Sequence, residues 1–433
     1  MIVGIDLSVL QTPHRMRGIG YTVINFINHL PDSAKADHRF VFYVFDDDES
    51  PLDLLDLNGV EFEMRTVRRF RLSSVARPGR MELVGRVLTE LRKIRDSVAG
   101  HSRMGDLSDL DVLLQFDQSQ PLPPPSAVRS VVIAYDIIPY VLEHDYLWSY
   151  RTTRGRGRSR TEAVRRAYLR RRYAARLQRV SRNAARVIAI SAHTKRDLVM
   201  WLGIDDDKVT VCHLGVTVAD LVRPESVTLQ HWVSSTWGPR QRDVDLTDEK
   251  FLLYVGGVDP RRRLSELVAA FNNLRAQGTD IKLVLTGDTM TGANQVPNAE
   301  LQQYLRATSY LDDILFMGFV DDHQREWLYE HAVAFVYPSV YEGFGLPVIE
   351  AMRYGTPVIT FDNSSIREIA GDAALYARDH REIASQVERL LHDDALRVRY
   401  SALGRSCAAR YSWAETSSRM LELALGSPLR PKA

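Results

Sequence analysis

The sequence has few cysteines and no long hydrophobic run. Its 433 residues include only two cysteines, Cys212 and Cys407, which excludes a disulfide framework and predicts a reducing, cytoplasmic environment. The longest apolar runs, such as VVIAYDIIPYV, are shorter than the ~18 residues that a membrane span needs. No basic region precedes the apolar stretch in MIVGIDLSVL, so we expect no signal peptide. With 45% hydrophobic and 26% charged residues, the chain is expected to fold into two or three domains.

Neither sign of charge is in large excess, but the charges are unevenly distributed. The formal net charge is +1, whereas residues 1–200 carry 32 basic and 23 acidic side chains and residues 201–433 carry 24 and 32. Two arginine-rich segments, 65–103 and 151–182, supply most of the basic excess, and the second contains 13 Arg and one Glu. Such a split indicates contact with a polyanion, either a nucleic acid or an anionic membrane.

Alternating strand and helix patterns predict an α/β fold with two doubly wound parallel sheets. In the first half, IVGIDLSV, GYTVINFINHLP and FVFYVF have the patterns of strand, helix and strand, and the second half repeats this alternation from FLLYVGGV onward. Residues 220–249 have neither period and are expected to form a linker. We therefore predict an N-terminal domain over 1–219, a C-terminal domain over 250–410 and a terminal helix within 411–433. Ligands of open α/β sheets bind at the carboxyl ends of the strands, which predicts a cleft between the domains.

Residues 337–359, YPSVYEGFGLPVIEAMRYGTPVI, are typical of an anion-binding loop that leads into a helix. Pro347 suits the first helical turn and Gly355 the helix end. The helix N-terminus would bind a phosphate through backbone N–H groups. We expect these groups to belong to Phe344, Gly345 and Leu346. Two carboxylates flank the loop, Glu342 and Glu350; they would repel phosphate but could bind the hydroxyls of an attached sugar.

The segment EGFGLPVIEAMRYGTPVI resembles the signature of the retaining glycosyltransferases of family 4, which have the GT-B fold. The segments YVGGVDPRRRL, LTGD, LFMGFVDD and NSSIREIAGDAAL are also similar to that family, as are RGIGYT, YDIIPY and IAISAHTKRDL in the first half. The resemblance extends over nearly the whole chain. It implies two Rossmann-like domains facing across a cleft, with acceptor bound by the N-terminal domain and nucleotide sugar by the C-terminal domain. A final helix would cross back to the N-terminal domain.

The resemblance implies roles for the two glutamates. Glu342 would face the donor sugar as a catalytic residue, and Glu350 would accept hydrogen bonds from the ribose hydroxyls of the nucleotide. The predicted reaction is a front-face displacement with retention, in which the leaving phosphate helps to deprotonate the acceptor.

Basic residues after the first strand of the C-terminal domain would neutralise the donor diphosphate. The family has a basic pair in this stretch, here occupied by Arg261 and Arg262, and Arg262 would act in catalysis by stabilising the leaving group. Gly257 lies in the same donor-binding stretch, where the family often has a basic residue. Asp259 is expected to begin a helix whose first turn contains Arg263 and its two neighbours, where cations oppose the helix dipole. Which arginine contacts the diphosphate is open, and a solvated basic turn is the alternative.

Gly18, Gly20 and Asp136 of the N-terminal domain also match the family, whereas Tyr135 departs from it. Gly18 and Gly20 are expected in a loop before a helix, where they would allow a close approach to the diphosphate and sugar. Tyr135 stands where the family commonly has His. Asp136 would position the acceptor hydroxyl as a third catalytic residue, and turn formation is the alternative.

We expect neither a metal nor a cofactor, because no Asp-x-Asp motif lies near a phosphate loop and the nucleotide sugar is a substrate. The DIIP segment and the N-terminal domain resemble enzymes that use GDP-mannose, which favours mannose over glucose, rhamnose or fucose. The acceptor would be a saccharide or a polyprenyl-linked saccharide, in the synthesis of a cell-surface polysaccharide or glycolipid.

Other functions remain open. A nucleic-acid-binding protein could use the arginine-rich segments, but no recognition module is found, so we expect no nucleic acid partner. A dinucleotide-dependent oxidoreductase is the third class, although GIGYTV lacks the third spaced glycine. Within the family hypothesis, segments 65–103 and 151–182 would dock on anionic lipid at the inner face of the plasma membrane, or on a polyprenyl diphosphate acceptor. A solvated basic helix surface is the alternative.

Overall fold

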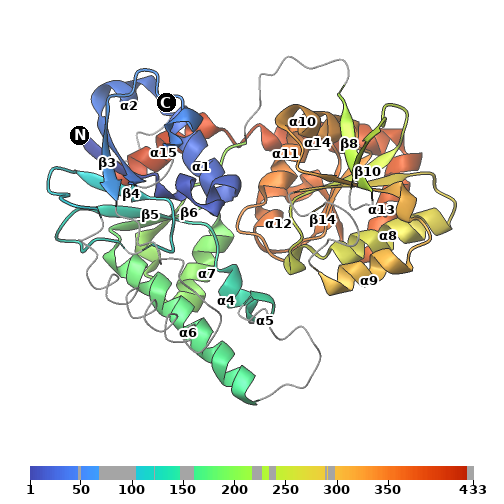
Figure 1. Ribbon diagram of the computed structural model, residues 1–433, viewed down its shortest axis with the longest axis horizontal. Coiled ribbons are helices and arrows are strands. Elements are labelled where there is room, and N and C mark those ends of the chain that lie inside the picture. The colour runs from blue at the N-terminus through green and yellow to red at the C-terminus, as the bar shows by residue number, and fades with distance from the viewer. Residues whose placement is uncertain are drawn as a thin grey trace. The chain divides into compact units, whose positions relative to one another are not determined.

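The computed structural model divides the chain into two compact units, each built on one parallel sheet (Figure 1). The first unit comprises Met1–Tyr140, Ser149–Gly215 and Trp413–Ala433; the second comprises Val141–Trp148 and Val216–Ser412. The structure describes residues 1–46, 50–67, 104–120, 122–146, 160–216, 227–233, 240–287, 290 and 298–426. Much of both arginine-rich segments, residues 68–103 and 151–159, therefore lies outside the described residues.

The sheet of the first unit has seven parallel strands in the order β3-β2-β1-β4-β5-β6-β7. The order reverses at β1, which lies between β2 and β4, and ligands of open α/β sheets bind at such a point. The strands are β1 (Ile2–Asp6), β2 (Arg39–Phe45), β3 (Phe62–Val67), β4 (Val112–Gln115), β5 (Ser130–Ala134), β6 (Arg186–Ala189) and β7 (Val209–Val211).

Helices cover this sheet, and the last helix of the chain belongs to it. Helix α15 (Trp413–Leu425) packs on α1, β4 and β6, and Trp413 contacts Tyr21 edge to face with ring centroids 5.9 Å apart. The other helices are α1 (Gly18–Asn28), α2 (Asp32–Asp37), α4 (Ile138–Val141), α6 (Arg160–Asn183) and α7 (Ala192–Leu202).

The sheet of the second unit has six parallel strands in the order β12-β11-β10-β13-β14-β15, and it reverses at β10. Strand residues such as Leu252, Leu253 and Phe335 are fully buried, as expected for a parallel sheet covered on both faces. The strands are β10 (Phe251–Val255), β11 (Lys282–Thr286), β12 (Ile314–Gly318), β13 (Ala334–Tyr337), β14 (Val358–Phe361) and β15 (Ala374–Ala377). The helices are α5 (Glu143–Tyr146), α8 (Leu264–Ala276), α9 (Ala299–Ala307), α10 (Asp322–His331), α11 (Leu346–Tyr354), α12 (Ser364–Ala370), α13 (His380–His392) and α14 (Asp394–Ala408).

The predicted fold class, two doubly wound parallel α/β sheets, is confirmed, but two segments differ from expectation. The expected linker 220–249 contains an antiparallel pair, β8 (Leu229–Val233) and β9 (Arg240–Val244). The sequence did not predict these strands, because polar and apolar residues are mixed here without a clear run of apolar residues. In β8, Leu229 is buried and its neighbour Gln230 is exposed. The arginine-rich segment 65–103, expected to lack strands, begins inside β3, where alternate residues are exposed.

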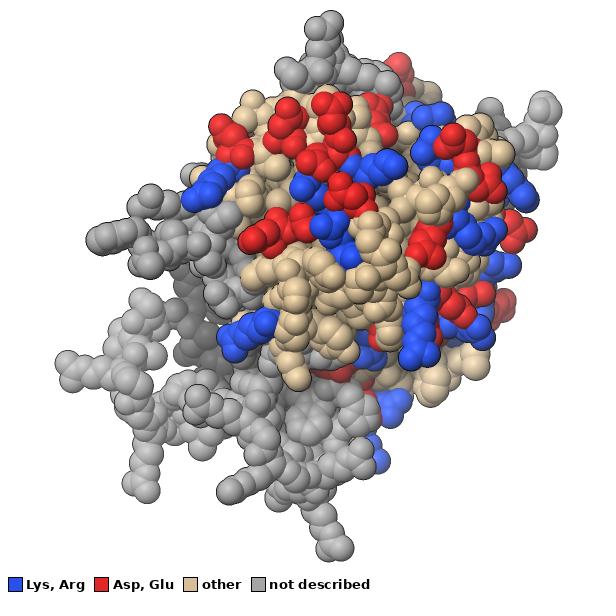
Figure 2. Space-filling view, turned by 90° about the vertical axis from the view of Figure 1, so that its right-hand side faces the viewer, with Lys and Arg blue, Asp and Glu red and all other residues tan. Residues whose placement is uncertain are grey.

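Over the coloured, described part of the face drawn in Figure 2, acidic and basic side chains are interspersed, and several acidic ones gather at the top of the view. None of the helices in the described part of the chain is long and apolar enough to cross a membrane.

Candidate active site

The candidate site of the second unit forms at the carboxyl ends of β10 and β13, where the strand order reverses. The chain after β10 is tightly packed. A Cβ atom on Gly287 would lie 2.3 Å from the carbonyl oxygen of Gly256, and a Cβ on Gly256 would lie 2.3 Å from Nη1 of Arg262. Both glycines have positive φ angles, +143° for Gly256 and +142° for Gly287. Glycine at these two positions therefore allows the backbone and Arg262 to meet.

The expected helix start after β10 is wrong in detail. Asp259 caps a 3-10 turn, Pro260–Arg262, by accepting a hydrogen bond from the backbone N–H of Arg261, and α8 begins only at Leu264. Arg263 separates the turn from the helix because it has the left-handed conformation, with φ 44° and ψ 45°. The arginines therefore precede the α-helix rather than fill its first turn.

Glu342 is the centre of a buried polar network. It is 7% exposed. Its Oε1 accepts hydrogen bonds from the Tyr337 hydroxyl (2.7 Å) and from Ser339 Oγ (2.9 Å). Its Oε2 accepts from Nη2 of Arg261 at 3.2 Å, and Nε of Arg262 lies 3.6 Å from Oε1. The two arginines that the sequence pairs with a diphosphate thus both reach the carboxylate predicted to face the sugar.

The electrostatics of this network favour the charged forms. Burial acts to raise the pKa of the Glu342 carboxyl, but Arg261, Arg262 and the Tyr337 hydrogen bond outweigh it, so the pKa lies below 4.5. Burial acts to lower the pKa of Arg261, but nearby groups, Glu342 foremost, outweigh it and the pKa is raised. Glu342 and the arginines are therefore ionised at neutral pH.

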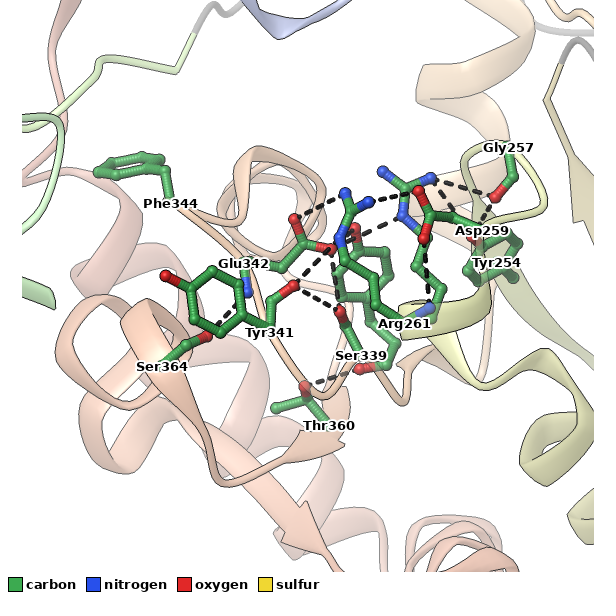
Figure 3. Close-up of polar contacts among 12 residues, drawn as sticks. Tyr254, Gly257, Asp259, Arg261, Ser339, Tyr341, Glu342, Phe344, Thr360 and Ser364 are labelled. Atoms are coloured by element: carbon green, nitrogen blue, oxygen red, sulfur yellow. Dashed lines mark hydrogen bonds and ion pairs between the residues drawn. The ribbon is translucent and has the colours of Figure 1, made fainter. Parts of the chain in front are cut away.

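The two arginines differ in their other partners. Arg261 donates from Nε to the carbonyl of Tyr341 (3.1 Å) and from Nη1 to Oδ2 of Asp259 (2.5 Å). Figure 3 shows its guanidinium between Asp259 and Glu342. Arg262 donates from Nη1 to the carbonyl of Gly257 at 3.2 Å. Its Nε is buried and has no hydrogen-bond partner among the described residues. The predicted site residue Gly257 therefore acts here through its carbonyl oxygen, which holds Arg262.

The predicted phosphate loop has the expected local geometry. Gly345 is the N-cap of α11 with φ +105°, and its carbonyl accepts from the backbone N–H of Val348 at 2.9 Å. No side chain caps this N-terminus, which begins at Leu346 with Pro347 in the first turn. A Cβ on Gly345 would lie 2.5 Å from Cδ1 of Ile366. Binding of an anion at this N-terminus remains a prediction.

Phe344 and Glu350 have separate surroundings. The Phe344 side chain is 3% exposed, contacts the Tyr411 ring edge to face at 5.7 Å, and lies apart from the arginine cluster in Figure 3. Any contact of Phe344 with a ligand would therefore involve its backbone. Glu350 is half-buried on α11, and its Oε2 accepts a hydrogen bond from the Tyr329 hydroxyl at 3.2 Å.

The glycines of the first unit are not in a loop. Gly18 and Gly20 form the first turn of α1. A Cβ on Gly20 would lie 2.3 Å from the carbonyl oxygen of Arg15, whereas a Cβ on Gly18 would meet nothing within 4 Å. Gly20 thus has a packing role, and only Gly18 leaves space that a ligand could use.

Asp136 follows β5 and is held by its neighbours. Its Oδ1 accepts a hydrogen bond from the backbone N–H of Ile138 at 2.9 Å. This bond forms a turn, which is the alternative to a catalytic role for Asp136. The Gln118 amide donates to the Asp136 carbonyl (2.6 Å) and accepts from the Tyr135 N–H (2.9 Å). Burial raises the pKa of the Tyr135 hydroxyl, so this side chain remains a neutral phenol.

Several residues of the network were not anticipated from the sequence. Tyr337, Ser339 and Tyr341 lie within the motif, but their types carry no specific signal. The contact of Tyr146 with Asp259 joins positions 113 residues apart, which no local pattern could reveal. Within the described residues, no group of three or more His, Cys, Asp or Glu side chains could hold a metal ion.

Two family profiles match the chain in consecutive segments. The family described as Glycosyltransferase Family 4 matches residues 16–220, and the family described as Glycosyl transferases group 1 matches residues 240–406.

Curated relatives are similar over about half of the chain. The O-antigen chain mannosyltransferase B of Escherichia coli is 27% identical over 241 residues, which are 55% of this chain and 60% of that protein. The phosphatidyl-myo-inositol mannosyltransferase of Mycobacterium leprae is 29% identical over 180 residues, 40% of this chain and 46% of that protein. The match thus spans roughly half the length of each of these relatives.

Solved structures share the fold over the full length. The crystal structure of the Anabaena protein HepE in complex with UDP and glucose superimposes with a TM-score of 0.61 at 15% identity, covering 99% of this chain and 100% of that one. At this identity the likeness establishes the GT-B fold.

Proposed function

Because the chain belongs to the group 1 glycosyltransferases of family 4, which are retaining enzymes with the GT-B fold, we propose that it transfers a hexose from a nucleotide sugar to a saccharide acceptor with retention of configuration. The observation that carries the proposal is the buried Glu342 carboxylate, held by Arg261 and Arg262 at the reversal point of the second sheet. Family membership favours group transfer over the oxidoreductase and nucleic-acid-binding alternatives.

The reaction is a front-face displacement without a metal. The bond between the anomeric carbon and the diphosphate breaks, the acceptor oxygen forms its bond on the same face, and its proton passes to the leaving phosphate. Arg261, Arg262 and the uncapped N-terminus of α11 supply the positive potential that stabilises the leaving group. Glu342 orients the sugar, and Glu350 accepts from the ribose hydroxyls.

The first unit provides the acceptor side of the reaction. Asp136 positions the acceptor hydroxyl through its carboxylate, which also accepts a hydrogen bond from the backbone N–H of Ile138, the first residue of α4. Gly18 and Gly20 begin α1, the first α-helix after β1, and the open space over Gly18 would allow the donor diphosphate and sugar to approach.

The donor is GDP-mannose and the acceptor is a saccharide or polyprenyl-linked saccharide of a cell-surface polysaccharide or glycolipid. The names of the relatives support this choice, since both are called mannosyltransferases and one is called an O-antigen chain mannosyltransferase. The UDP and glucose bound to HepE mark UDP-glucose as the competing donor.

A thermal-shift panel of GDP, UDP, ADP, dTDP and their sugars tests the donor. A nucleotide at 100 times its dissociation constant stabilises the folded protein by ~2.7 kcal/mol. We expect GDP-mannose to give the largest shift, and the largest shift from UDP-glucose would overturn the choice of donor. Glu342→Gln keeps the side-chain shape and should retain the shift from GDP while transfer is lost. Near-wild-type transfer by a folded Glu342→Gln protein would refute the role of Glu342.

We further propose that this protein is cytoplasmic and binds anionic lipid at the membrane surface. The binding surface is the basic face of the first unit, which is formed by residues 65–103 and 151–182. In the described part of this face, Arg171 and Arg172 are exposed on α6. Nearby, Arg170 lies over the Tyr140 ring (4.1 Å to the centroid), and that ring lies 6.3 Å from the ring of Trp201, which is 50% exposed. Exposed arginines on α6, together with an exposed Trp201 that is linked to this helix through Tyr140 and Arg170, suit the membrane–water interface.

Co-sedimentation with vesicles tests this surface. We expect binding to vesicles that contain phosphatidylserine, weaker binding to pure phosphatidylcholine, and a loss of binding in Trp201→Ser and Arg171→Gln/Arg172→Gln proteins. Phe319→Ser is the matched control, because Phe319 is 69% exposed in the second unit. Equal binding to both lipids would contradict the proposal.

A further inference from the structure

The segment Val141–Trp148 lies between β5 and α6 in the sequence, yet it packs within the second unit. It contains α5, and the half-buried Tyr146 ends that helix. The Tyr146 hydroxyl donates a hydrogen bond to Oδ1 of Asp259 and accepts one from Nη1 of Arg261 at 3.0 Å. A residue from the first half of the sequence thus contacts the arginine that holds Glu342.

Both hydrogen-bonding functions of the phenol are used. Its single proton goes to Asp259, and its oxygen accepts from Arg261. Burial raises the pKa of Tyr146, so the phenol keeps this proton at neutral pH. Asp259 in turn accepts from the backbone and from the side chain of Arg261. These contacts close a ring of hydrogen bonds around one guanidinium.

Four of the five N–H groups of Arg261 have acceptors within the protein. Nε donates to Tyr341, Nη1 to Asp259 and Tyr146, and Nη2 to Glu342. This guanidinium therefore connects a fixed anchor on one side with the Glu342 carboxylate on the other.

Arg262 has a different character. Its Nε is buried, lies 3.6 Å from Glu342 Oε1, and has no hydrogen-bond partner among the described residues. A buried, charged donor without a hydrogen bond is costly, and an anionic ligand would supply the missing acceptor. Arg261 thus has protein acceptors for four of its five N–H groups, whereas Arg262 keeps a buried Nε–H that has none among the described residues.

We infer that the two arginines have different roles. Arg262 contacts the diphosphate. Arg261, which is held in place by Tyr146 and Asp259, positions the Glu342 carboxylate toward the donor sugar. The inference rests on the proposed function. Tyr146 is then a positioning residue that influences binding of the sugar through Arg261 and Glu342. It does not influence binding of the nucleotide or its phosphates.

The experiment compares the affinities for GDP and GDP-mannose by calorimetry on the full chain. UDP and UDP-glucose are used instead if they are the better ligands of the wild-type protein. The ratio of the two dissociation constants isolates the contribution of the sugar. Tyr146→Phe should leave the affinity for the diphosphate unchanged and reduce the sugar contribution about 3- to 10-fold, the range for one hydrogen bond. The kcat should fall by a similar factor. Arg262→Lys should instead weaken both ligands together.

Two controls separate positioning from folding. Tyr304→Phe, on α9 with 40% exposure, removes a phenol of the same unit and should change neither affinity. In an Arg261→Lys background Tyr146→Phe should have no further effect, because the positioning path is already broken. Equal weakening of the diphosphate and its sugar by Tyr146→Phe would overturn the inference, as would an unchanged sugar contribution. Failure of the wild-type protein to bind any nucleoside diphosphate would instead reject the proposed function itself, and the inference with it.

Discussion

Glu342 is both a candidate catalytic residue and the charge partner of two buried guanidinium groups. Side-chain exposure is 9% for Glu342, 12% for Arg261 and 17% for Arg262. Removing one member of a buried ion pair leaves the opposite charge uncompensated, which is more costly than losing the contact itself. Substitutions at Glu342 therefore test stability and catalysis together unless the replacement keeps the hydrogen bonds.

At this residue we predict a large difference between two substitutions. Glu342→Ala should lower the free energy of unfolding by about 3–5 kcal/mol, because both arginines lose their carboxylate. Glu342→Gln should cost less, because the amide oxygen still accepts from Tyr337 and Ser339. Urea denaturation of the two variants measures the difference, and equal, small losses would contradict a buried ion-pair network.

The lowered pKa of Glu342 determines how the stability of the folded protein changes with pH. Because the carboxyl titrates below its unfolded value of 4.5, its ion pairs contribute stability above that pH, and this contribution is lost as the pH falls through the lower folded value. Between pH 5 and 8, its titration should change neither stability nor nucleotide binding. Urea midpoints measured from pH 8 to pH 3 should thus show a fall below pH 4.5 that is smaller in Glu342→Gln. An equal fall in both proteins would contradict the assignment.

Arg263 carries backbone strain that can be relieved. A left-handed conformation costs an ordinary L-residue about 1–2 kcal/mol, and glycine adopts it freely at some cost in unfolded-state entropy. Arg263→Gly should therefore raise the free energy of unfolding by roughly 1 kcal/mol. Arg263→Ala is the control, since alanine keeps the strain and should change little. Destabilisation by Arg263→Gly in urea denaturation would show that the arginine side chain stabilises the turn.

At the scale of elements, α1 and the turn after β10 show what local patterns do and do not reveal. The apolar spacing in GYTVINFINHLP predicts α1, but the glycines at its start were expected in a loop, because glycine disfavours helices. Close packing against the Arg15 backbone explains why glycine occupies position 20, and this contact could not be predicted from the sequence. Likewise, Asp259 and Pro260 correctly predict a capped start, but Arg263 ends the turn before α8 begins.

The two glycines of α1 should respond differently to alanine. Gly18→Ala meets open space and should be neutral or stabilising by up to ~1 kcal/mol, the difference in helix propensity. Gly20→Ala would push against the Arg15 backbone and should cost about 1–3 kcal/mol. Thermal unfolding of both variants checks the contrast. If Gly18→Ala weakens GDP-mannose binding in a stable protein, a ligand approaches Gly18; equal destabilisation by both variants would contradict the packing explanation for Gly20.

At the scale of the whole molecule, the two parallel sheets and the family could be predicted, because β/α alternation and the motif around Glu342 are local in the sequence. The pairing of β8 and β9 could not, since Leu229 alone is buried among residues 229–232, the part of β8 whose burial is described. The segment Val141–Trp148 could not either, because its membership of the second unit depends on contacts with residues more than a hundred positions away. The sequence thus identifies Glu342 and the arginines, while the structure supplies the partners that determine what each can do.

Retaining transfer from a nucleotide sugar can be tested by real-time NMR of the released sugar. The protein is incubated with GDP-mannose, and with UDP-glucose in parallel, and the anomeric signals are followed before mutarotation, with water as the acceptor. We expect the first product to have the same anomeric configuration as the donor, and Glu342→Gln to release far less of it. A first product of inverted configuration, or no turnover of either donor by a protein that binds it, would contradict retaining transfer by this protein.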